Sequence, residues 1–304
     1  MTAVKNTLIV IAGPTGVGKT DLSLRLAQHF NTAIISADSR QCYREMTIGT
    51  AKPSAEILQQ APHYFINSHA ITQELNAADF ERLGLEYLDE IFSSNNIALL
   101  CGGTGLYIRA LLEGMDEMPP VDEAIQQQVE NAFQQYGIEW LQEALRRNDP
   151  DFFENAEQQN PARLIRALSF FLSHQQSVSR FRTGVKKQRD FKTIKIALNL
   201  PREILYQRIN QRVLQMMDEG LLAEVTTLWP QRHLKNLQTV GYQELFGYLE
   251  GKYDLQTAVS LIQQHSRNYA KRQLTWFRKS PEWQWFAPDE DQAILEFIRQ
   301  QLSE

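Results

Sequence analysis

The fold is decided by one short stretch near the start of the chain: Gly13, Pro14, Thr15, Gly16, Val17, Gly18, Lys19 and Thr20. It has the pattern G-x-x-x-x-G-K-[ST], which binds phosphate when it joins a strand to a helix. The apolar run 8–12 before it predicts a strand, and residues 21–30 after it predict an amphipathic helix. In that context a chance glycine-rich turn is a poor alternative. The stretch therefore predicts a site for a di- or triphosphate.

The chemistry of this loop follows from its residue types. Glycines let the backbone curl so that several N–H groups point inward, and the following helix adds the positive end of its dipole. Lys19 supplies a mobile positive charge, and Thr20 supplies a hydroxyl for Mg²⁺. We expect the whole loop to bind phosphate groups, with Thr20 as a metal ligand and Mg²⁺ as the cofactor.

The order of apolar and amphipathic segments predicts an α/β fold. Residues 32–36, 97–101 and 194–200 have the composition of strands, and helical patterns such as 79–92 lie between them. Alternating strands and helices imply a parallel sheet with helices on both faces, and ligands bind at the carboxyl ends of its strands. With the phosphate loop, this pattern predicts a P-loop NTPase-like core.

The alternation stops between about residues 119 and 179. This stretch is rich in Gln, Glu, Leu and Ala, has apolar residues at helical spacing and contains no strand candidate. We therefore expect a helical insertion over residues 119–180, in a core formed by residues 1–118 and 181–304. After residue 201 the pattern is helical again to about residue 279, with breaks near residues 229 and 240.

The composition is that of a globular protein without a membrane segment. Of 304 residues, 43% are hydrophobic and 22% are charged, and no apolar run is long enough to span a bilayer. The first apolar run leads straight into the phosphate loop, so it predicts a strand rather than a signal peptide. Cys42 and Cys101 have no partner at metal-ligand spacing and suggest reduced thiols. We expect a cytoplasmic monomer that does not bind a membrane.

Charge is segregated along the chain, although the net charge is only −5. Residues 113–160 are acidic, with Arg146 and Arg147 as their only basic residues. Two stretches are basic: residues 180–195, where Asp190 is the one acidic residue, and residues 267–279, where aromatic residues are interleaved. Segregated charge suits a polyanion bound on one face. A solvated helix face is the alternative for either stretch taken alone.

Asp38 is the candidate base, because it follows the second predicted strand. Glycines follow the strand that ends at Cys101, in place of the acidic residue that is usual in ATPases and GTPases, and no Asn-Lys-x-Asp guanine reader is present. A carboxylate at Asp38 would lie beside the phosphate loop, where it can take a proton from an incoming nucleophile. The alternative is a helix N-cap or turn residue.

Two further features place polar groups near the same strand ends. The run Gly102–Gly105 is a second glycine-rich turn, in which Thr104 either bonds a ligand or simply closes a tight turn. Arg208 and Arg212 stand four residues apart on a predicted helix over residues 204–217, so both point from one face. They would neutralise a leaving diphosphate. Pairing with Glu203 or with solvent is the alternative.

Several motifs occur together in a fixed order: GPTGVGKT at 13–20, SADSRQ at 36–41, IGTAKP at 48–53, GGTGLY at 102–107, RLIRAL at 163–168, Arg208 with Arg212, and KRQLTWFR at 271–278. This ordered set resembles the tRNA dimethylallyltransferase family, from the first strand to about residue 280. No single motif is decisive, but the set in this order is highly specific.

The resemblance implies transfer of a dimethylallyl group from its diphosphate to N6 of adenosine 37, next to the anticodon of tRNA, with Mg²⁺ as cofactor. It also implies that Asp38, Thr104 and Lys19 are catalytic and that the insertion grips the anticodon stem-loop. The tRNA contacts that it implies are Asp38, Ser39, Arg40, Gln41, Thr104, Gln126, Ala162, Arg163, Leu164, Ile165, Arg166, Lys271 and Arg272.

Two other functions fit the phosphate loop. A small-molecule kinase would use ATP as donor and Asp38 to activate a hydroxyl, but such a substrate needs neither the insertion nor the basic stretches. A nucleotide-dependent RNA-binding module would need neither Asp38 nor Thr104 in its cleft. For the transferase, Asp38 and Thr104 must lie within about 10 Å of each other, so that they share one hydrogen-bonding site.

Overall fold

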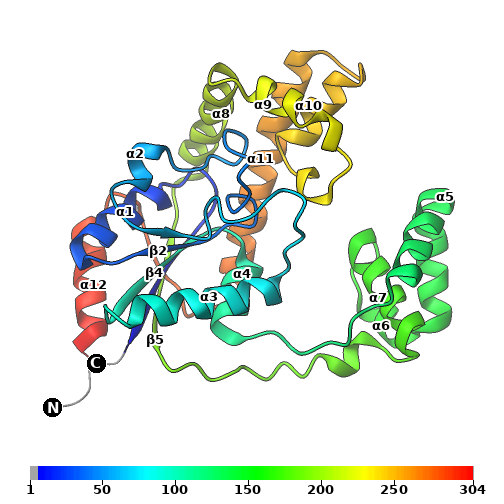
Figure 1. The fold of residues 1–304 in the computed structure, drawn as a ribbon, viewed down its shortest axis with the longest axis horizontal. Helices are drawn as coiled ribbons and strands as arrows, with labels where there is room; N and C mark the ends of the chain where they lie inside the picture. Colours follow the sequence, from blue (N-terminus) through cyan, green and yellow to red (C-terminus); the bar gives the residue numbers. More distant parts are fainter. Residues whose placement is uncertain (1–5, 304) are drawn as a thin grey trace. The chain divides into compact units, whose positions relative to one another are not determined.

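The computed structural model describes residues 6–303, which form two compact units (Figure 1). The core unit runs to Gly114 and resumes at Gln188, and the helical unit is Met115–Lys187. The helical unit therefore extends beyond the predicted insertion, 119–180, at both ends. The entering and leaving segments bond to each other, since the Thr183 hydroxyl donates to Asp116 Oδ1 at 2.5 Å.

The core unit is built on a six-stranded sheet in which every strand is parallel to its neighbours. The strands are β1 Thr7–Ala12, β2 Ile34–Ala37, β3 His63–Tyr64, β4 Ile97–Gly102, β5 Lys192–Leu198 and β6 Gln284–Phe286. Their spatial order is β3-β2-β4-β1-β5-β6, which places β1 and its phosphate loop near the middle. The predicted parallel sheet is confirmed. β3 and β6 were not predicted because two or three residues are too few to show a strand pattern.

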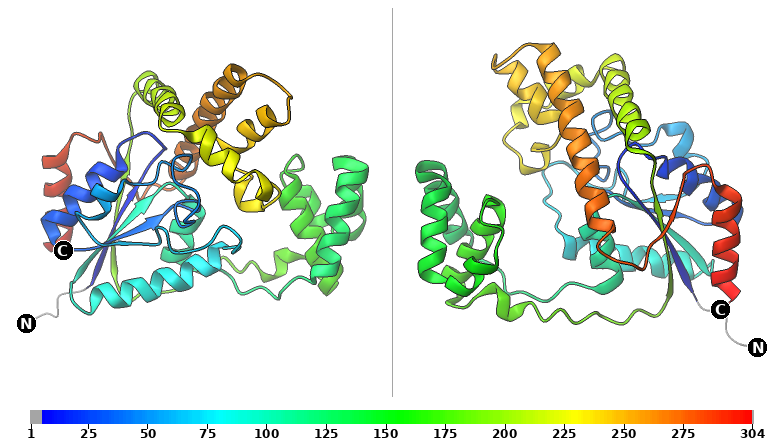
Figure 2. Two further views of the ribbon diagram at one scale, coloured as in Figure 1. Left: turned by 45° about the horizontal axis from the view of Figure 1, so that its top comes forward. Right: turned by 180° about the vertical axis from the view of Figure 1, so that it is seen from behind.

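Helices cover both faces of this sheet, which is why β1 is buried along its whole length (Figure 2). One face packs on α1 (Lys19–Phe30), α8 (Arg202–Asp218) and α12 (Asp291–Ser303) through a continuous aliphatic core. The opposite face carries α3 (Ala77–Phe92) and α4 (Gly105–Glu113). The first and last helices of the core unit therefore lie on the same face.

The chain after residue 201 is helical, as predicted. Beyond α8 it forms α9 (Leu221–Thr227), α10 (Tyr242–Leu249) and α11 (Leu255–Phe277), and α11 packs against both α8 and α10. The predicted breaks near residues 229 and 240 fall between these helices, in a segment that contains two short 3₁₀ turns. Strand β6 and helix α12 follow in a segment for which no individual element was predicted.

Local sequence sets the start of each helix that leads into the site. α1 begins after Gly18, whose φ of 107° is left-handed backbone that glycine adopts without strain. α11 begins at Asp254, whose carboxylate accepts from Thr257 N at 2.8 Å and so caps the helix. α4 begins after Thr104, whose side chain makes no capping bond, so its hydroxyl serves another partner.

The helical unit contains α5 (Glu123–Asn148), α6 (Pro150–Asn155) and α7 (Pro161–His174), and a 3₁₀ turn follows at Val178–Phe181. Each α-helix starts at an Asp or Asn whose side chain accepts a backbone N–H of the first turn. α5 and α7 pack on each other around a core of aromatic and aliphatic side chains. Gly137 interrupts α5 with a φ of 75°. Within residues 6–303, no helix combines the length and apolar character needed to cross a bilayer.

Candidate active site

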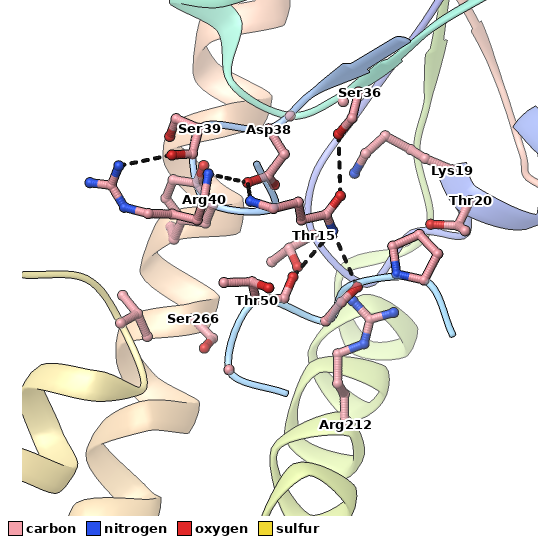
Figure 3. A pocket seen from close by; sticks show the side chains of 18 of the residues that line it. Thr15, Lys19, Thr20, Ser36, Asp38, Ser39, Arg40, Thr50, Arg212 and Ser266 are labelled. Atoms are coloured by element: carbon pink, nitrogen blue, oxygen red, sulfur yellow. Dashed lines mark hydrogen bonds between the residues drawn. The ribbon is translucent and has the colours of Figure 1, made fainter. Parts of the chain in front are cut away.

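A pocket of about 290 Å³ lies at the carboxyl ends of β1, β2 and β4 (Figure 3). Three segments singled out in the sequence meet there: the phosphate loop, the run after β2 and the second glycine-rich turn. Helices α8 and α11 complete the wall. The polar lining includes Thr15, Lys19, Thr20, Ser36, Asp38, Ser39, Arg40, Gln41, Thr50, Arg212, Ser266, Tyr269 and Gln273. All of these residues belong to the core unit, so the pocket is complete within it.

The phosphate loop presents only part of its length to the pocket. Thr15, Lys19 and Thr20 line it, whereas Val17 is fully buried in the core, so the Val17 side chain contacts no ligand. Lys19 Nζ donates to Pro14 O at 2.8 Å. Burial lowers the pKa of Lys19 to about 8, although the nearby Cys101 and Asp38 act in the opposite direction. A bound phosphate would raise this pKa again, because its negative charge favours the protonated amine.

The two candidate arginines of α8 differ in position, because Arg212 lines the pocket and Arg208 does not. Arg212 is exposed along part of its length, but its guanidinium points into the pocket from α8 (Figure 3). Burial lowers the pKa of Arg212, while Asp21 and Glu219 raise it, and a guanidinium remains charged throughout. Arg208 is exposed and does not line the pocket; its Nη1 lies 4.0 Å from where a Cβ on Gly18 would be. Arg212 therefore faces the pocket, and Arg208 lies beside Gly18 outside the pocket lining.

Asp38 is both a turn residue and a pocket residue, so the two interpretations of the sequence are compatible. Its Oδ1 accepts from Arg40 N at 2.9 Å and from Gln41 N at 3.3 Å, which closes the turn after β2. Among residues 6–303, Oδ2 has no hydrogen-bond partner. The turn holds the carboxyl group in place and leaves one oxygen facing the pocket.

Thr104 lies beside Asp38, although it does not itself line the pocket. Its Oγ1 accepts from the backbone N of Ser39 at 3.2 Å. Tyr269 of α11, which does line the pocket, lies next to Thr104. Burial, followed by the Asp38 carboxylate, raises the pKa of Tyr269 to about 12, so its hydroxyl stays protonated.

Sequence reasoning missed the residues that brace the pocket. Gln41 was assigned to tRNA, but its Nε2 donates to Thr50 O and Ala51 O at 3.2 Å each, which holds the IGTAKP loop against the site. Glu224 of α9 holds the same loop from outside by accepting from three successive backbone N–H groups, those of Thr47, Ile48 and Gly49. The IGTAKP motif at residues 48–53 marks this loop in the sequence, but its letters do not reveal that the loop is held against the pocket.

The same holds for α11. The KRQLTWFR motif was recognised, yet Gln273 within it received no role, and Tyr269 and Ser266 lie just before it. All three side chains line the pocket. The presence of a glutamine, tyrosine or serine in a helical pattern does not show whether its side chain faces solvent or a pocket.

The donor set of the pocket fits a magnesium ion that is bound mostly by substrate. Residues 6–303 contain no cluster of three or more His, Cys, Asp or Glu side chains that would form an all-protein metal site. Thr20, whose hydroxyl is the expected protein ligand, lines the pocket. Mg²⁺ commonly takes one or two protein ligands and completes its shell with water and phosphate oxygens.

The candidate tRNA contacts fall in both units. In the core unit, Lys271 and Arg272 are exposed on α11, and the Arg272 guanidinium lies 5.7 Å from the ring centre of Tyr269. Arg40 lines the pocket, and its Nε is buried with no hydrogen-bond partner within residues 6–303. A bound polyanion would satisfy such a donor.

In the helical unit, some of the tRNA contacts that the family resemblance implies are exposed and others are buried. Ala162, Arg163 and Arg166 are exposed on α7, and Gln126 is exposed on α5, where it donates to Glu130 at 2.9 Å. Ile165 is half-buried. Leu164 is fully buried and packs in the core of the unit, so it supports the surface rather than contacting a ligand.

The basic stretch 180–195 is not one surface. Its last part is structural: Arg189 pairs with Glu81 at 2.8 Å, and the two side chains are only 12% and 9% exposed. Lys192 donates to Gln301 O, and Lys195 pairs with Glu282. The part that remains as a candidate for RNA is Arg180, Arg182, Lys186 and Lys187, all in the helical unit.

A parallel sheet, a phosphate loop and a facing carboxylate in one pocket define a P-loop enzyme of the group-transfer kind. The IPP transferase family model matches residues 41–280. A tRNA dimethylallyltransferase of Cytophaga hutchinsonii is 44% identical over 100% of both chains, and tRNA dimethylallyltransferase 1 of Bacteroides thetaiotaomicron is 45% identical over 97% of this chain and 96% of that one.

Solved structures agree with the sequence relatives. The full-length tRNA isopentenylpyrophosphate transferase of Bacillus halodurans superposes with a TM-score of 0.73 at 36% identity, and the match covers 98% of this chain and 97% of that one. A eukaryotic dimethylallyltransferase acting on tRNA gives a TM-score of 0.72 at 26% identity, over 89% of this chain and 69% of that one. The chain belongs to the IPP transferase family.

Proposed function

We propose that this chain is a tRNA dimethylallyltransferase, which transfers the dimethylallyl group of dimethylallyl diphosphate to N6 of adenosine 37. The products are N6-(dimethylallyl)adenosine in the tRNA and free diphosphate. The observation that carries the proposal is that the phosphate loop and Asp38 line one pocket, so a diphosphate and an incoming amine can meet there.

The donor half of the pocket is built to stabilise the leaving diphosphate. Backbone N–H groups of the loop and the N-terminus of α1 bind the phosphate oxygens. Negative charge grows on the diphosphate as the allylic C–O bond breaks, and Lys19 and Arg212 stand where they can neutralise it. Mg²⁺, held by the Thr20 hydroxyl together with phosphate oxygens, would add positive charge at the same place.

The acceptor half handles the proton. The N6 amine forms a C–N bond to the allylic carbon while the C–O bond to diphosphate breaks, and the nitrogen then carries a proton in excess. Asp38 accepts that proton through the carboxylate oxygen that its turn leaves open. Ser39 and Thr104, joined by a hydrogen bond, lie next to Asp38 and would hold the base.

The tRNA must present its base to this pocket. Adenine leaves the stack of an anticodon loop at a lower cost than it leaves a duplex, which suits a single-stranded target. We propose that Lys271 and Arg272 on α11 contact the backbone near the pocket, and that Arg163 and Arg166 on α7 contact the stem. We also propose that the protein acts as a monomer in the cytoplasm.

Incubation with radiolabelled dimethylallyl diphosphate or γ-labelled ATP, each with and without total tRNA, tests this proposal. We expect label from dimethylallyl diphosphate in tRNA and no phosphoryl transfer from ATP. Transfer of phosphate from ATP to a small acceptor, without any need for tRNA, would support a kinase instead. Binding of tRNA without transfer of either group would support an RNA-binding module.

A further inference from the structure

Gln273 is a buried polar residue that the mechanism above does not use. It lies on α11 and is only 6% exposed. Its Oε1 accepts from the backbone N of Thr15 at 2.8 Å, and its Nε2 donates to the backbone O of Gly103 at 3.0 Å. One side-chain amide therefore joins the phosphate loop to the second glycine-rich turn, which come from different strands.

The position of this amide favours glycine at position 103, because a larger residue there would displace it. A Cβ on Gly103 would lie 2.1 Å from Gln273 Nε2, which no real contact allows, and 3.3 Å from Gly13 O. The φ of Gly103 is not in the left-handed region, so the close approach of Gln273 explains this glycine where backbone strain does not. The Gln273 amide therefore lies between the second glycine-rich turn and the phosphate loop and contacts both.

The contact continues to the acceptor side of the pocket. Thr104 follows Gly103 directly, and its hydroxyl accepts from Ser39 N, one residue beyond Asp38. The bond to Gln273 also occupies the N–H of Thr15, so the loop N–H groups that remain for phosphate lie further along the loop. A shift of the Gln273 amide would therefore move the donor and acceptor groups relative to each other.

We propose that Gln273 is a positioning residue, which fixes the phosphate loop and the Gly103–Thr104 turn at the spacing that transfer from the diphosphate to the amine requires. This inference rests on the proposed function and deepens it. Gln273 need not touch either substrate. Misplacement of reacting groups by about 1 Å can cost a factor of about 10² in rate. Loss of the two hydrogen bonds of the Gln273 amide should therefore lower the transfer rate measurably.

The first test replaces Gln273 with Met, which keeps length and approximate volume and removes both hydrogen bonds. Gln263→Met is the matched control, because it makes the same change on the same helix at an amide that donates to Asn210 O at 3.2 Å. We expect Q273M to slow single-turnover transfer by about 10²-fold at saturating substrates, while both dissociation constants stay within a few fold. Q263M should behave like the wild type.

A second variant, Gln273→Glu, separates positioning from packing. The glutamate can still accept from Thr15 N, but it can donate to Gly103 O only when it is protonated. Burial against a carbonyl raises the pKa of such a carboxyl, so protonation occurs at accessible pH. We expect the Q273E rate, relative to that of the wild type, to rise as the pH falls. A residue needed only for stability would show a constant ratio.

A double-mutant cycle completes the experiment. Gly103→Ala should slow transfer in the wild-type background because it displaces the amide, and should cost little more in a Gln273→Ala background. The wild-type rate tests the proposed function, whereas these ratios test Gln273 alone. An unchanged single-turnover rate in Q273M, a loss fully explained by weaker diphosphate binding, or additive effects in the cycle would overturn the proposal.

Discussion

At the scale of single residues, Asp38 closes a turn and also lines the pocket in which we propose that it is the base. One carboxylate oxygen accepts two backbone N–H groups and closes the turn after β2. Those bonds hold the carboxyl group at the pocket wall, and within residues 6–303 they leave the second oxygen without a hydrogen-bond partner. The local turn chemistry of Asp and the need for a base thus point to the same residue type.

Asp38→Asn separates these two roles. The amide oxygen of Asn can still accept from Arg40 N and Gln41 N, so we expect the thermal midpoint and both substrate affinities to change little. Because the amide cannot take up a proton, the single-turnover rate should fall by about 10²-fold or more. An unchanged single-turnover rate would show that Asp38 is not the base.

Lys19 predicts the pH dependence of donor binding. Burial lowers its pKa to about 8 in the free protein, and a bound diphosphate raises it again, so the protonated form is the one that binds. We expect kcat/KM for dimethylallyl diphosphate to be level below about pH 8 and to fall by about tenfold per pH unit above it. The dissociation constant of tRNA alone is the control and should stay flat across that step.

Lys19→Ala tests whether donor and RNA sites are separate. Loss of the charge should abolish transfer, because nothing else in the loop replaces that cation at the phosphates. The affinity for tRNA, measured by filter binding, should remain within a few fold of the wild type. A parallel loss of tRNA affinity would contradict the separation.

The sequence predicted the residues whose chemistry has a pattern and missed those whose role depends on packing. Lys19 and Asp38 follow predicted strands and line the pocket, as expected. Gln273 and Tyr269 could not be found, because a polar residue in a helix gains its role from what the helix packs against. The burial of Leu164 follows the same rule, since a motif marks a segment but not the direction of each side chain.

At the scale of elements, α11 joins the pocket to the exterior. Tyr269 and Gln273 are four residues apart and face the pocket, whereas Lys271 and Arg272 lie on its exposed side. The predicted strands and helices from residue 8 to residue 279 were confirmed, because their periodic patterns are long enough to be recognised. The short strands β3 and β6 were not predicted, because they are defined by pairing with neighbouring strands and not by a local sequence pattern.

The two parts of the basic stretch 180–195 should respond differently to mutation: one should affect tRNA binding and the other stability. Neutralising Arg180, Arg182, Lys186 and Lys187 together should raise the KM for tRNA and reduce the slope of log affinity against log salt, by up to about 0.7–0.9 per lost phosphate contact. The rate at saturating tRNA should hardly change. An unaltered slope would identify these residues as an ordinary solvated surface.

Arg189, from the same stretch, should act on stability instead. It pairs with Glu81 and donates to Leu111 O at 2.9 Å, in a site where both side chains are nearly buried. Arg189→Met leaves Glu81 buried without this partner, so we expect the free energy of unfolding to fall by about 3 kcal/mol in urea titrations. The salt slope of tRNA binding should stay at the wild-type value; a flatter slope with unchanged stability would place Arg189 on the RNA surface.

At the scale of the whole molecule, the chain forms two compact units. The core unit holds the complete pocket, and the helical unit carries exposed arginines on α7 with no part of the pocket. The change of pattern near residue 119 predicts a helical insertion there. Its boundaries differ by a few residues because the segments joining the units bond to each other, which no local pattern reveals.

We propose that the diphosphate and the amine meet in the pocket between the phosphate loop and Asp38. The most direct measurement is mass spectrometry of nuclease fragments from tRNA that has been incubated with the protein, Mg²⁺ and dimethylallyl diphosphate. We expect one dimethylallyl group on N6 of adenosine 37 with the wild type, and none with Lys19→Ala. Unmodified tRNA with the wild type, modification at another atom, or full modification with Lys19→Ala would contradict it.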